Sequence, residues 1–413
     1  MSNRTESPLT RRVAVLSLHT SPLAQPGRGD SGGMNVYVRE LAASLAHRGV
    51  EVHVYVRRWH AELPRVVDIE PGVRVVHIDA GPPSLEKEQL YDIVDDYIEG
   101  VVDDIEAIGG VDVLHANYWL SGVAGHHIKH RLDRPLVTTF HTLARVKAET
   151  GDHEPERRAR AEAEVIACSD VVTASGAAEQ HWLERLYDTD PDRIEIVTPG
   201  VKHAFFAPGD KAGARSAIGF GAEPMMLFVG RIQPLKGVTV AVEALASVEN
   251  ITTCLVIVGG PSGLEGEQEM ERVRALIEEH GLQGRVRFEP PVPHHLLSTW
   301  YRAADVVIVP SRSESFGLVA LEAGACGTPV VAAAVGGLRT IVEHGRTGYL
   351  VEQRNPLIYA SYVDQLLGNA FVSGEMAFNA AERARYFSWT ETAKSLLEVY
   401  DVLATRAVTD CHA

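Results

Sequence analysis

The stretch VVIVPSRSESFGLVALE, residues 306–322, decides the fold class of this chain. Its first four residues are apolar and β-branched, which predicts a buried strand, and the apolar run that starts near Phe316 predicts a helix. The polar loop between them presents Glu314. In parallel sheets covered by helices, ligands bind beyond the carboxyl ends of the strands, so this loop is a candidate site.

The same alternation of short strands and amphipathic stretches runs along the chain and restarts once, after turn clusters at Thr198-Pro199-Gly200 and Ala207-Pro208-Gly209. Strands are predicted at residues 13–18, 52–56, 75–78, 113–115, 136–140, 171–174 and 194–197, then at 226–229, 255–258, 286–288, 306–309 and 330–333. Strands that alternate with helices predict right-handed βαβ units and parallel sheets. We therefore expect an α/β protein with Rossmann-like domains at residues 1–200 and 201–386, followed by residues 387–413 with a helix from Trp389 to Leu403.

Length and composition fit this division. At 413 residues, with 45% hydrophobic and 23% charged residues, the chain suits two globular domains, and two lobes imply a cleft. The net charge of −16 argues against nucleic-acid binding and against a polybasic membrane anchor. The apolar runs are shorter than the ~18 residues of a membrane span, so we expect a cytoplasmic protein with no membrane partner.

The four cysteines, Cys168, Cys254, Cys326 and Cys411, lie far apart and form no C-x-x-C pair. The spacing predicts neither a disulfide framework nor a zinc site, and it fits a reducing compartment.

A glycine-rich loop follows the first predicted strand. Residues 27–32, GRGDSG, match G-x-G-x-x-G, but the match does not directly follow its strand, and the second strand ends in Arg57-Arg58 where a dinucleotide site needs an acid. We interpret Gly32-Gly33 as letting backbone amides approach a diphosphate at the start of the helix that opens at Met34. A plain glycine turn is the alternative.

Two further loops carry charged residues after strands. In GRIQPLKG, residues 230–237, Arg231 and Lys236 can both face phosphate oxygens and neutralise a leaving diphosphate, although a solvated basic turn has the same appearance. Glu314 and Glu322 form an E-x7-E pattern, with the second acid about two helical turns beyond the first. Carboxylates accept hydrogen bonds from vicinal hydroxyls, so Glu314 suits a sugar and Glu322 a ribose.

The first domain adds Lys87, Tyr118, His141-Thr142 and Arg160. Each is weak evidence alone, because a histidine after a strand is usually structural and a lysine in an E-K-E run is usually solvated.

With the paired glycines, GRIQPLKG and E-x7-E present in this order, the chain resembles the retaining family-4 glycosyltransferases of the GT-B fold. The resemblance implies two Rossmann-like domains and a C-terminal helix that crosses back to the first domain. Residues 17–37, SLHTSPLAQPGRGDSGGMNVY, are most similar to the branch that acts in mycothiol biosynthesis. That branch implies transfer from UDP-N-acetylglucosamine (UDP-GlcNAc) to 1D-myo-inositol 3-phosphate by a homodimer.

The resemblance also implies site residues. The acceptor ring is expected at His19, Asp30, Ser31, Gly32, Gly33, Met34 and Asn35, and its phosphate at Lys87, Tyr118, Thr142 and Arg160. The charge pattern of residues 151–161 is irregular, so Arg158 is an alternative to Arg160. The donor is expected at Gln25, Pro26, Gly33, Arg231, Lys236, Val292, Glu314 and Glu322.

For the chemistry, the resemblance implies Arg231, Lys236, His141 and Glu314 as catalytic residues and no cofactor. Arg231 and Lys236 would stabilise the leaving diphosphate, and His141 would orient the sugar. A peripheral Mg²⁺ is implied at Tyr301, Arg302, Ala304 and Thr328, where no acidic cluster predicts it.

Three alternatives remain at this stage. The first is a related transferase that uses fructose 6-phosphate, as sucrose-phosphate synthases do, and the second is one with a phosphoinositide lipid as acceptor. The acidic residues between Glu86 and Glu106 oppose the lipid. The third is a non-catalytic nucleotide-sugar-binding protein, which would not need the set of Lys87, Tyr118, Thr142 and Arg160.

Overall fold

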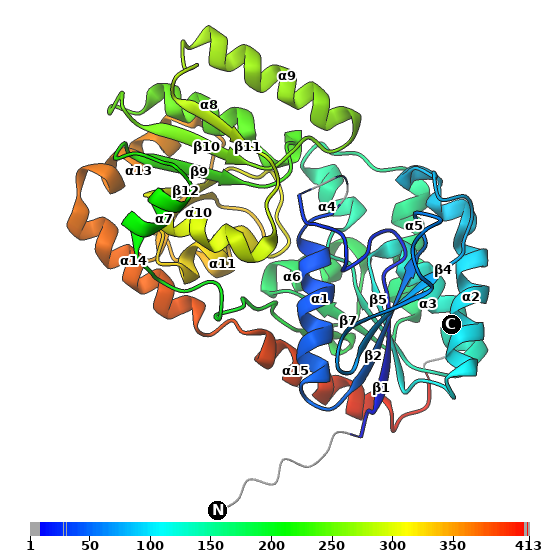
Figure 1. Cartoon of the computed structure of the whole chain (residues 1–413). Helices are drawn as coiled ribbons and strands as arrows, with labels where there is room; N and C mark the ends of the chain where they lie inside the picture. The colour runs from blue at the N-terminus through cyan, green and yellow to red at the C-terminus, as the bar shows by residue number, and fades with distance from the viewer. Residues whose placement is uncertain (1–8, 28, 30, 409–410, 412–413) are drawn as a thin grey trace, which may run out of the picture. The chain divides into compact units, whose positions relative to one another are not determined.

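The computed structural model describes residues 9–27, 29, 31–408 and 411, so Asp30 lies outside the described residues. The chain forms two compact units (Figure 1). The first comprises the described parts of Met1–Leu23, Tyr37–Thr198 and Trp389–Ala413, and the second those of Ala24–Val36 and Pro199–Ser388. The loop before the first helix, placed by the sequence within residues 1–200, thus groups with the second unit. The hydrogen bond from Gln25 Nε2 to the Pro291 carbonyl, 2.7 Å long, shows why.

The first unit is built on one eight-stranded sheet in the order β3-β4-β2-β1-β5-β6-β7-β8. All neighbours are parallel except the β3–β4 pair. The strands are β1 (Arg12–Leu16), β2 (Glu51–Arg57), β3 (Val66–Glu70), β4 (Val73–Ile78), β5 (Val113–Asn117), β6 (Leu136–Thr139), β7 (Val171–Ala174) and β8 (Ile194–Ile196). The central strands are buried on both faces, as the β-branched runs predicted.

The helices of the first unit cover this sheet. They are α1 (Gly33–Ala46, whose first residues belong to the second unit), η1 (Lys87–Ile93), α2 (Val94–Ala107), α3 (Trp119–Leu132), α4 (Ala144–Glu149), α5 (Glu156–Cys168), α6 (Ala177–Tyr187), η2 (Pro191–Arg193) and α15 (Trp389–Leu403). The row α2, α3 and α5 packs side by side. In α2 the buried apolar residues recur with helical spacing at Val94, Tyr97, Ile98, Val101, Val102 and Ile105. The carboxylates of Asp95 and Asp96 interact favourably with the positive end of the helix dipole.

The second unit holds a six-stranded parallel sheet in the order β11-β10-β9-β12-β13-β14. The strands are β9 (Met225–Val229), β10 (Cys254–Val258), β11 (Val286–Glu289), β12 (Val306–Val309), β13 (Val330–Ala333) and β14 (Gly348–Val351). Their side chains alternate between two cores: Leu227 and Val307 belong to one, Met226 and Val306 to the other.

Two rows of helices complete the second unit. The helices are α7 (Lys211–Ala217), η3 (Pro234–Lys236), α8 (Val238–Ser247), α9 (Gly263–Glu279), η4 (His294–Leu296), α10 (Leu297–Ala303), α11 (Leu318–Ala325), α12 (Leu338–Ile341), α13 (Pro356–Gly368) and α14 (Ala370–Ala384). One row contains α9, α8 and α13, and the other contains α7, α10, α11 and α14.

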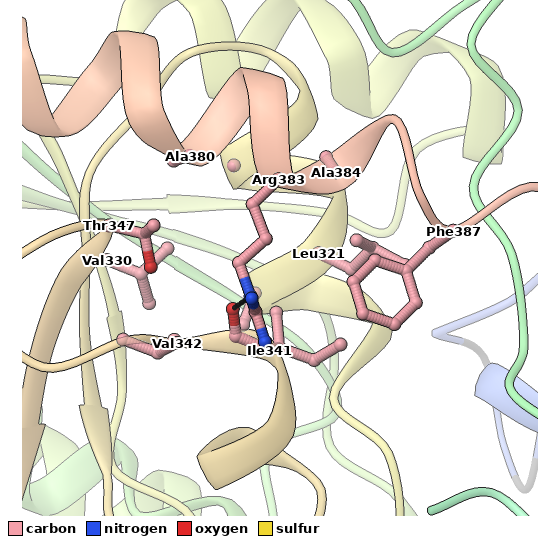
Figure 2. A pocket seen from close by; sticks show the side chains of 11 residues that line it. Leu321, Val330, Ile341, Val342, Thr347, Ala380, Arg383, Ala384 and Phe387 are labelled. Carbon is pink, nitrogen blue, oxygen red and sulfur yellow. Dashed lines mark hydrogen bonds between the residues drawn. The ribbon is translucent and has the colours of Figure 1, made fainter.

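Arg383 fastens α14 to the rest of its unit. Figure 2 shows its side chain extending from α14 toward Ile341, whose carbonyl accepts from Arg383 Nε at 2.9 Å. The guanidinium also bonds the Thr340 carbonyl and the Glu343 carboxylate. The cavity beside it has a volume of only about 10 Å³, room for at most one water, so this contact is packing and not a ligand site.

The C-terminal helix α15 returns to the first unit, as the GT-B resemblance implied. The Trp389 ring lies 5.6 Å from the Tyr37 ring of α1, and Arg48 Nη2 donates to the Thr390 carbonyl at 3.3 Å. Figure 1 shows α15, in red, beside α1. The predicted fold class is confirmed. No helix within the described ranges is long and apolar enough to span a membrane.

The spacing of the cysteines predicted no disulfide framework, and this prediction is wrong for two of the four. Cys168, at the end of α5, and Cys411, in the C-terminal tail, form a disulfide with a Cα–Cα distance of 5.0 Å. They are 243 positions apart in sequence, so spacing could not reveal the pair. Cys254 and Cys326 are free thiols, and burial raises the pKa of Cys326 to about 12.

Candidate active site

Tyr118 is the centre of a polar cluster in the first unit. It directly follows β5 with a positive φ of 77°, which is strained for a residue with a side chain, and its N–H donates to the Thr139 carbonyl at 2.8 Å. The His19 ring lies 4.2 Å from the Tyr118 ring. Lys87 Nζ and Arg158 Cζ lie 5.4 Å and 5.0 Å from its centroid. Two cations thus converge on one buried aromatic ring.

Arg158, and not Arg160, belongs to this cluster. Arg158 is only 2% exposed, and its Nη2 donates to Thr142 Oγ1 at 3.0 Å and to the Thr142 carbonyl at 3.1 Å. Arg160 is exposed. Side chains two positions apart are rotated by about 200° about the helix axis and leave nearly opposite faces, so only one of the two arginines can face Thr142. The structure therefore favours the alternative residue of the sequence analysis.

The charge of Arg158 is balanced by two carboxylates. Its Nε donates to Glu162 and its Nη1 to Glu154, each at 2.8 Å. The fully buried Glu162 also accepts from the Ala144 N–H at 2.9 Å and from the Tyr187 hydroxyl. These bonds fix the guanidinium in one orientation, with Nη2 toward Thr142.

His141 lies next to this cluster and is held as a neutral ring. Its φ is 61°, its Nε2 donates to Asn117 Oδ1 at 2.8 Å, and its ring lies 4.8 Å from that of Tyr37. Burial lowers the pKa of His141 to about 3. A group with this pKa is a poor base near neutral pH, so the side chain is suited to hydrogen bonding and orientation.

The buried His115 of β5 makes the stability of the protein depend on pH. This ring is fully buried, with Nδ1 2.5 Å from the Tyr400 hydroxyl and Nε2 2.8 Å from Thr139 Oγ1. Burial, together with His141, lowers the pKa of His115 to about 3, below the ~6.5 of an unfolded histidine. The unfolded chain then binds the proton more readily. His115 therefore makes its full contribution to the free energy of unfolding above about pH 6.5. This contribution falls by about 1.4 kcal/mol per pH unit as the pH is lowered toward 3.

The free energy of unfolding is measured with denaturant at pH 7 and at pH 5. We expect it to decrease less between pH 7 and pH 5 in His115→Gln than in the wild type. An equal slope in both proteins would show that His115 does not titrate on unfolding.

In the second unit, the described residues of the loop that precedes α1 lie against the loops that follow β9 and β10. Ser262 Oγ donates to the Gly29 carbonyl at 2.8 Å and lies 3.5 Å from Arg231 Nη1. A Cβ added at Gly32 would stand 3.6 Å from Arg231 Nε, so the backbone of this loop passes directly over the guanidinium. Asn35 Oδ1 accepts from the Gly32 N–H at 2.8 Å and closes the turn.

Of the other residues predicted to contact the acceptor or the donor, Ser31, Gly33 and Val292 have neighbours within the second unit. Ser31 is buried and its carbonyl accepts from the Gly27 N–H at 2.8 Å, while Pro26 and Met34 are half-buried. Gly33 faces Leu318 at the start of α11. Val292 is partly buried against the apolar core of the second unit.

Lys236 and Glu314 form an ion pair with Nζ–Oε2 at 2.7 Å, and their side chains are 24% and 19% exposed. Their loops are joined by the bond from the Arg312 N–H to the Leu235 carbonyl at 2.8 Å. Gly237 allows this approach: its φ is 73°, and a Cβ there would stand 2.3 Å from the Pro310 oxygen. Lys236 and Glu314, which were predicted from separate motifs, therefore lie in contact with each other.

Glu322, inside α11 as expected, is 4% exposed and already engaged on both oxygens. Its Oε2 accepts from the Tyr301 hydroxyl at 2.9 Å, and its Oε1 lies 2.6 Å from His294 Nε2. The carboxylate is therefore held in place, and the sequence analysis did not identify His294 as a partner.

The four residues implied for Mg²⁺ offer no carboxylate. Tyr301 directs its hydroxyl to Glu322, Arg302 is itself a cation, and Thr328 Oγ1 donates to the Tyr301 carbonyl at 2.6 Å. Asp305, the nearest acid in sequence, is bonded by Lys211, Arg215 and the Met225 N–H. A pocket of about 700 Å³ opens beside Arg302, Ala304 and Thr328, and Lys211, Asp305 and Glu382 also line it. Because Asp305 already pairs with Lys211 and Arg215, and the four implied residues offer no carboxylate, these residues do not fit the carboxylate ligation that Mg²⁺ prefers. No chemical step is derived through this ion.

Comparison with known families assigns both halves of the chain. Residues 31–205 match the model of Glycosyltransferase Family 4, and residues 212–386 match that of Glycosyl transferases group 1.

Individual relatives are similar over nearly the whole length. A D-inositol 3-phosphate glycosyltransferase from Xylanimonas cellulosilytica is 46% identical, with 94% of this chain and 96% of that protein covered. One of the same name from Thermomonospora curvata is 44% identical, with 94% and 95% covered. A solved sucrose-phosphate synthase from Thermosynechococcus elongatus superposes with a TM-score of 0.89 at 31% identity, covering 95% of this chain and 99% of the other.

Proposed function

The chain belongs to the family-4 glycosyltransferases, in the group of the D-inositol 3-phosphate glycosyltransferases, and we propose on this premise that it makes the first intermediate of mycothiol biosynthesis. In the proposed reaction, N-acetylglucosamine passes from UDP-GlcNAc to 1D-myo-inositol 3-phosphate with retention of the anomeric configuration.

The observation that carries the acceptor assignment is the cluster around Tyr118. Lys87 and Arg158 supply two cations, and Tyr118 and Thr142 supply two hydroxyls, all within one unit. This set offers charged and neutral hydrogen-bond donors to the oxygens of a phosphate, while Glu154 and Glu162 balance the charge of Arg158. A neutral sugar would offer no anionic oxygens to Lys87 and Arg158, which disfavours it as an acceptor.

On the donor side, Arg231 and Lys236 are assigned to the diphosphate, Glu314 to the sugar hydroxyls and Glu322 to the ribose. The backbone amides of Gly33 and of the α11 N-terminus add donors for the phosphates. The bond from the anomeric carbon to the diphosphate breaks, and the bond to the acceptor oxygen forms on the same face. The acceptor proton passes to the departing phosphate oxygen, whose developing charge Arg231 and Lys236 stabilise.

His141 is assigned to orienting the sugar, in keeping with its neutral ring. A homodimer and a peripheral Mg²⁺ rest on the family resemblance alone, and a cytoplasmic location rests on the short apolar runs of the sequence. Fructose 6-phosphate is the second candidate acceptor, because the sucrose-phosphate synthase shares 31% identity and the fold.

The product identifies the reaction. Purified full-length protein is incubated with UDP-GlcNAc and 1D-myo-inositol 3-phosphate, the product mass is measured, and the anomeric coupling constant is read by NMR. We expect one N-acetylhexosamine added to the acceptor through an α linkage. A β-linked product would refute retention, and the absence of a product under conditions where the protein is folded would refute the assigned reaction.

A further inference from the structure

Four metal-ligating side chains meet in the first unit, apart from every residue assigned to the transfer reaction. They are His126 and His130 of α3, Cys168 at the end of α5 and Cys411 of the C-terminal tail. One ligand atom of each lies within 4.8 Å of those of the other three. His130 Nε2 is 3.3 Å from Cys168 Sγ and 2.9 Å from Cys411 Sγ.

Helix geometry explains how α3 contributes two ligands. His126 and His130 are four residues apart, so their side chains leave the same face of the helix, and their ring centroids are 5.4 Å apart. A disulfide alone requires no imidazole beside it. Two cysteines and two histidines, in contrast, are the ligand set of tetrahedral zinc sites.

The surroundings suit a bound ion. Cys168 is 1% exposed, whereas His130 is exposed, so the cluster is anchored in the core and open to solvent on one side. The fully buried Lys129 donates to the Cys168 carbonyl at 2.6 Å and pairs with Asp170 at 2.9 Å. These bonds fix the end of α5 that presents the thiol, as second-layer contacts do in metal sites.

From this juxtaposition we propose that His126, His130, Cys168 and Cys411 bind one Zn²⁺ per chain when the Cys168–Cys411 bond is reduced. Two thiols form when the disulfide gains two electrons and two protons. They lose both protons as the ion binds, and the ion then replaces the disulfide as the link between α5 and the C-terminal tail. The site is independent of the proposed sugar transfer.

The test uses the full chain, reduced with a water-soluble phosphine that is oxidised to its phosphine oxide, and Co²⁺ as the spectroscopic substitute for Zn²⁺. We expect one Co²⁺ per chain with the intense visible bands of tetrahedral coordination and a sulfur-to-cobalt charge-transfer band. Zn²⁺ should displace it, and the oxidised protein should bind none.

Matched variants separate this site from adventitious binding. Cys411→Ser and His130→Ala change residues outside the core, so both should fold and lose the bands. Cys254→Ser, a free thiol of the second unit, and His47→Ala, an exposed histidine of the first, should bind as the wild type does. The proposal is overturned if the reduced wild type shows no tetrahedral spectrum, or if Cys411→Ser and His130→Ala retain it.

Discussion

Replacing Lys236 with alanine should lower turnover on the order of 100- to 1000-fold, the usual effect of removing one charge-assisted group from a transition state. Lys236 Nζ lies 2.7 Å from Glu314 Oε2 in a half-buried pair, so a donor diphosphate would meet a cation already fixed in position. Because the charge on the diphosphate grows only as its bond breaks, the loss should fall mainly on kcat. The rate of UDP release at saturating substrate concentrations measures this loss in kcat.

Lys211→Ala is the matched control for this experiment. Lys211 also pairs with a carboxylate of the second unit, Asp305, but it has no assigned part in catalysis. Its turnover should stay near that of the wild type, and both variants should keep their melting temperatures within a few degrees. Turnover of Lys236→Ala within tenfold of the wild type would remove Lys236 from the catalytic residues.

Arg158→Lys should raise the acceptor KM about 10- to 100-fold and leave the donor KM unchanged. The lysine keeps the positive charge beside the buried Glu162 but cannot reproduce the forked donors that now bond Thr142. A lost hydrogen bond to a charged group costs about 1.5 to 3 kcal/mol, which sets this range. Initial rates against acceptor concentration measure the change.

The exposed Arg160 provides the control, because Arg160→Ala should leave both KM values within about twofold of the wild type. Arg158→Ala is a poorer probe, since an unpaired buried Glu162 would cost about 3 to 5 kcal/mol of stability. If Arg160→Ala weakened acceptor binding and Arg158→Lys did not, the assignment of the acceptor phosphate would have to return to Arg160.

The sequence predicted the parallel cores of both sheets closely, because buried β-branched runs carry a strong signal. It placed β7, β12, β13 and α15 at their observed bounds. It missed β3 and β14. The edge strand β3 mixes valines with Asp68 and Glu70 and pairs in the antiparallel sense, and β14 is a four-residue strand that opens with Gly348. Short or charged edge strands do not stand out from loops in a pattern of hydrophobicity.

The candidate site was predictable where motifs follow strands directly. Lys236 contacts Glu314, and Arg231 lies beside Gly32 of the glycine-rich loop. These residues come together because the carboxyl ends of parallel strands share one edge of the sheet. Arg158 was harder, since Arg158 and Arg160 on α5 differ only in the side of the helix that they face. The partners Asn117, Ser262 and His294 carry no motif of their own, and only the tertiary packing brings them to His141, Arg231 and Glu322.

The most direct test of the central claim is UDP release from UDP-GlcNAc with three acceptors compared in parallel: 1D-myo-inositol 3-phosphate, free myo-inositol and fructose 6-phosphate. Lys87, Tyr118, Thr142 and Arg158 are assigned to a phosphate on an inositol ring, so turnover is predicted with the first acceptor only. Comparable turnover with free myo-inositol would contradict the phosphate assignment of this cluster. Turnover with fructose 6-phosphate in place of inositol 3-phosphate would contradict the proposed function.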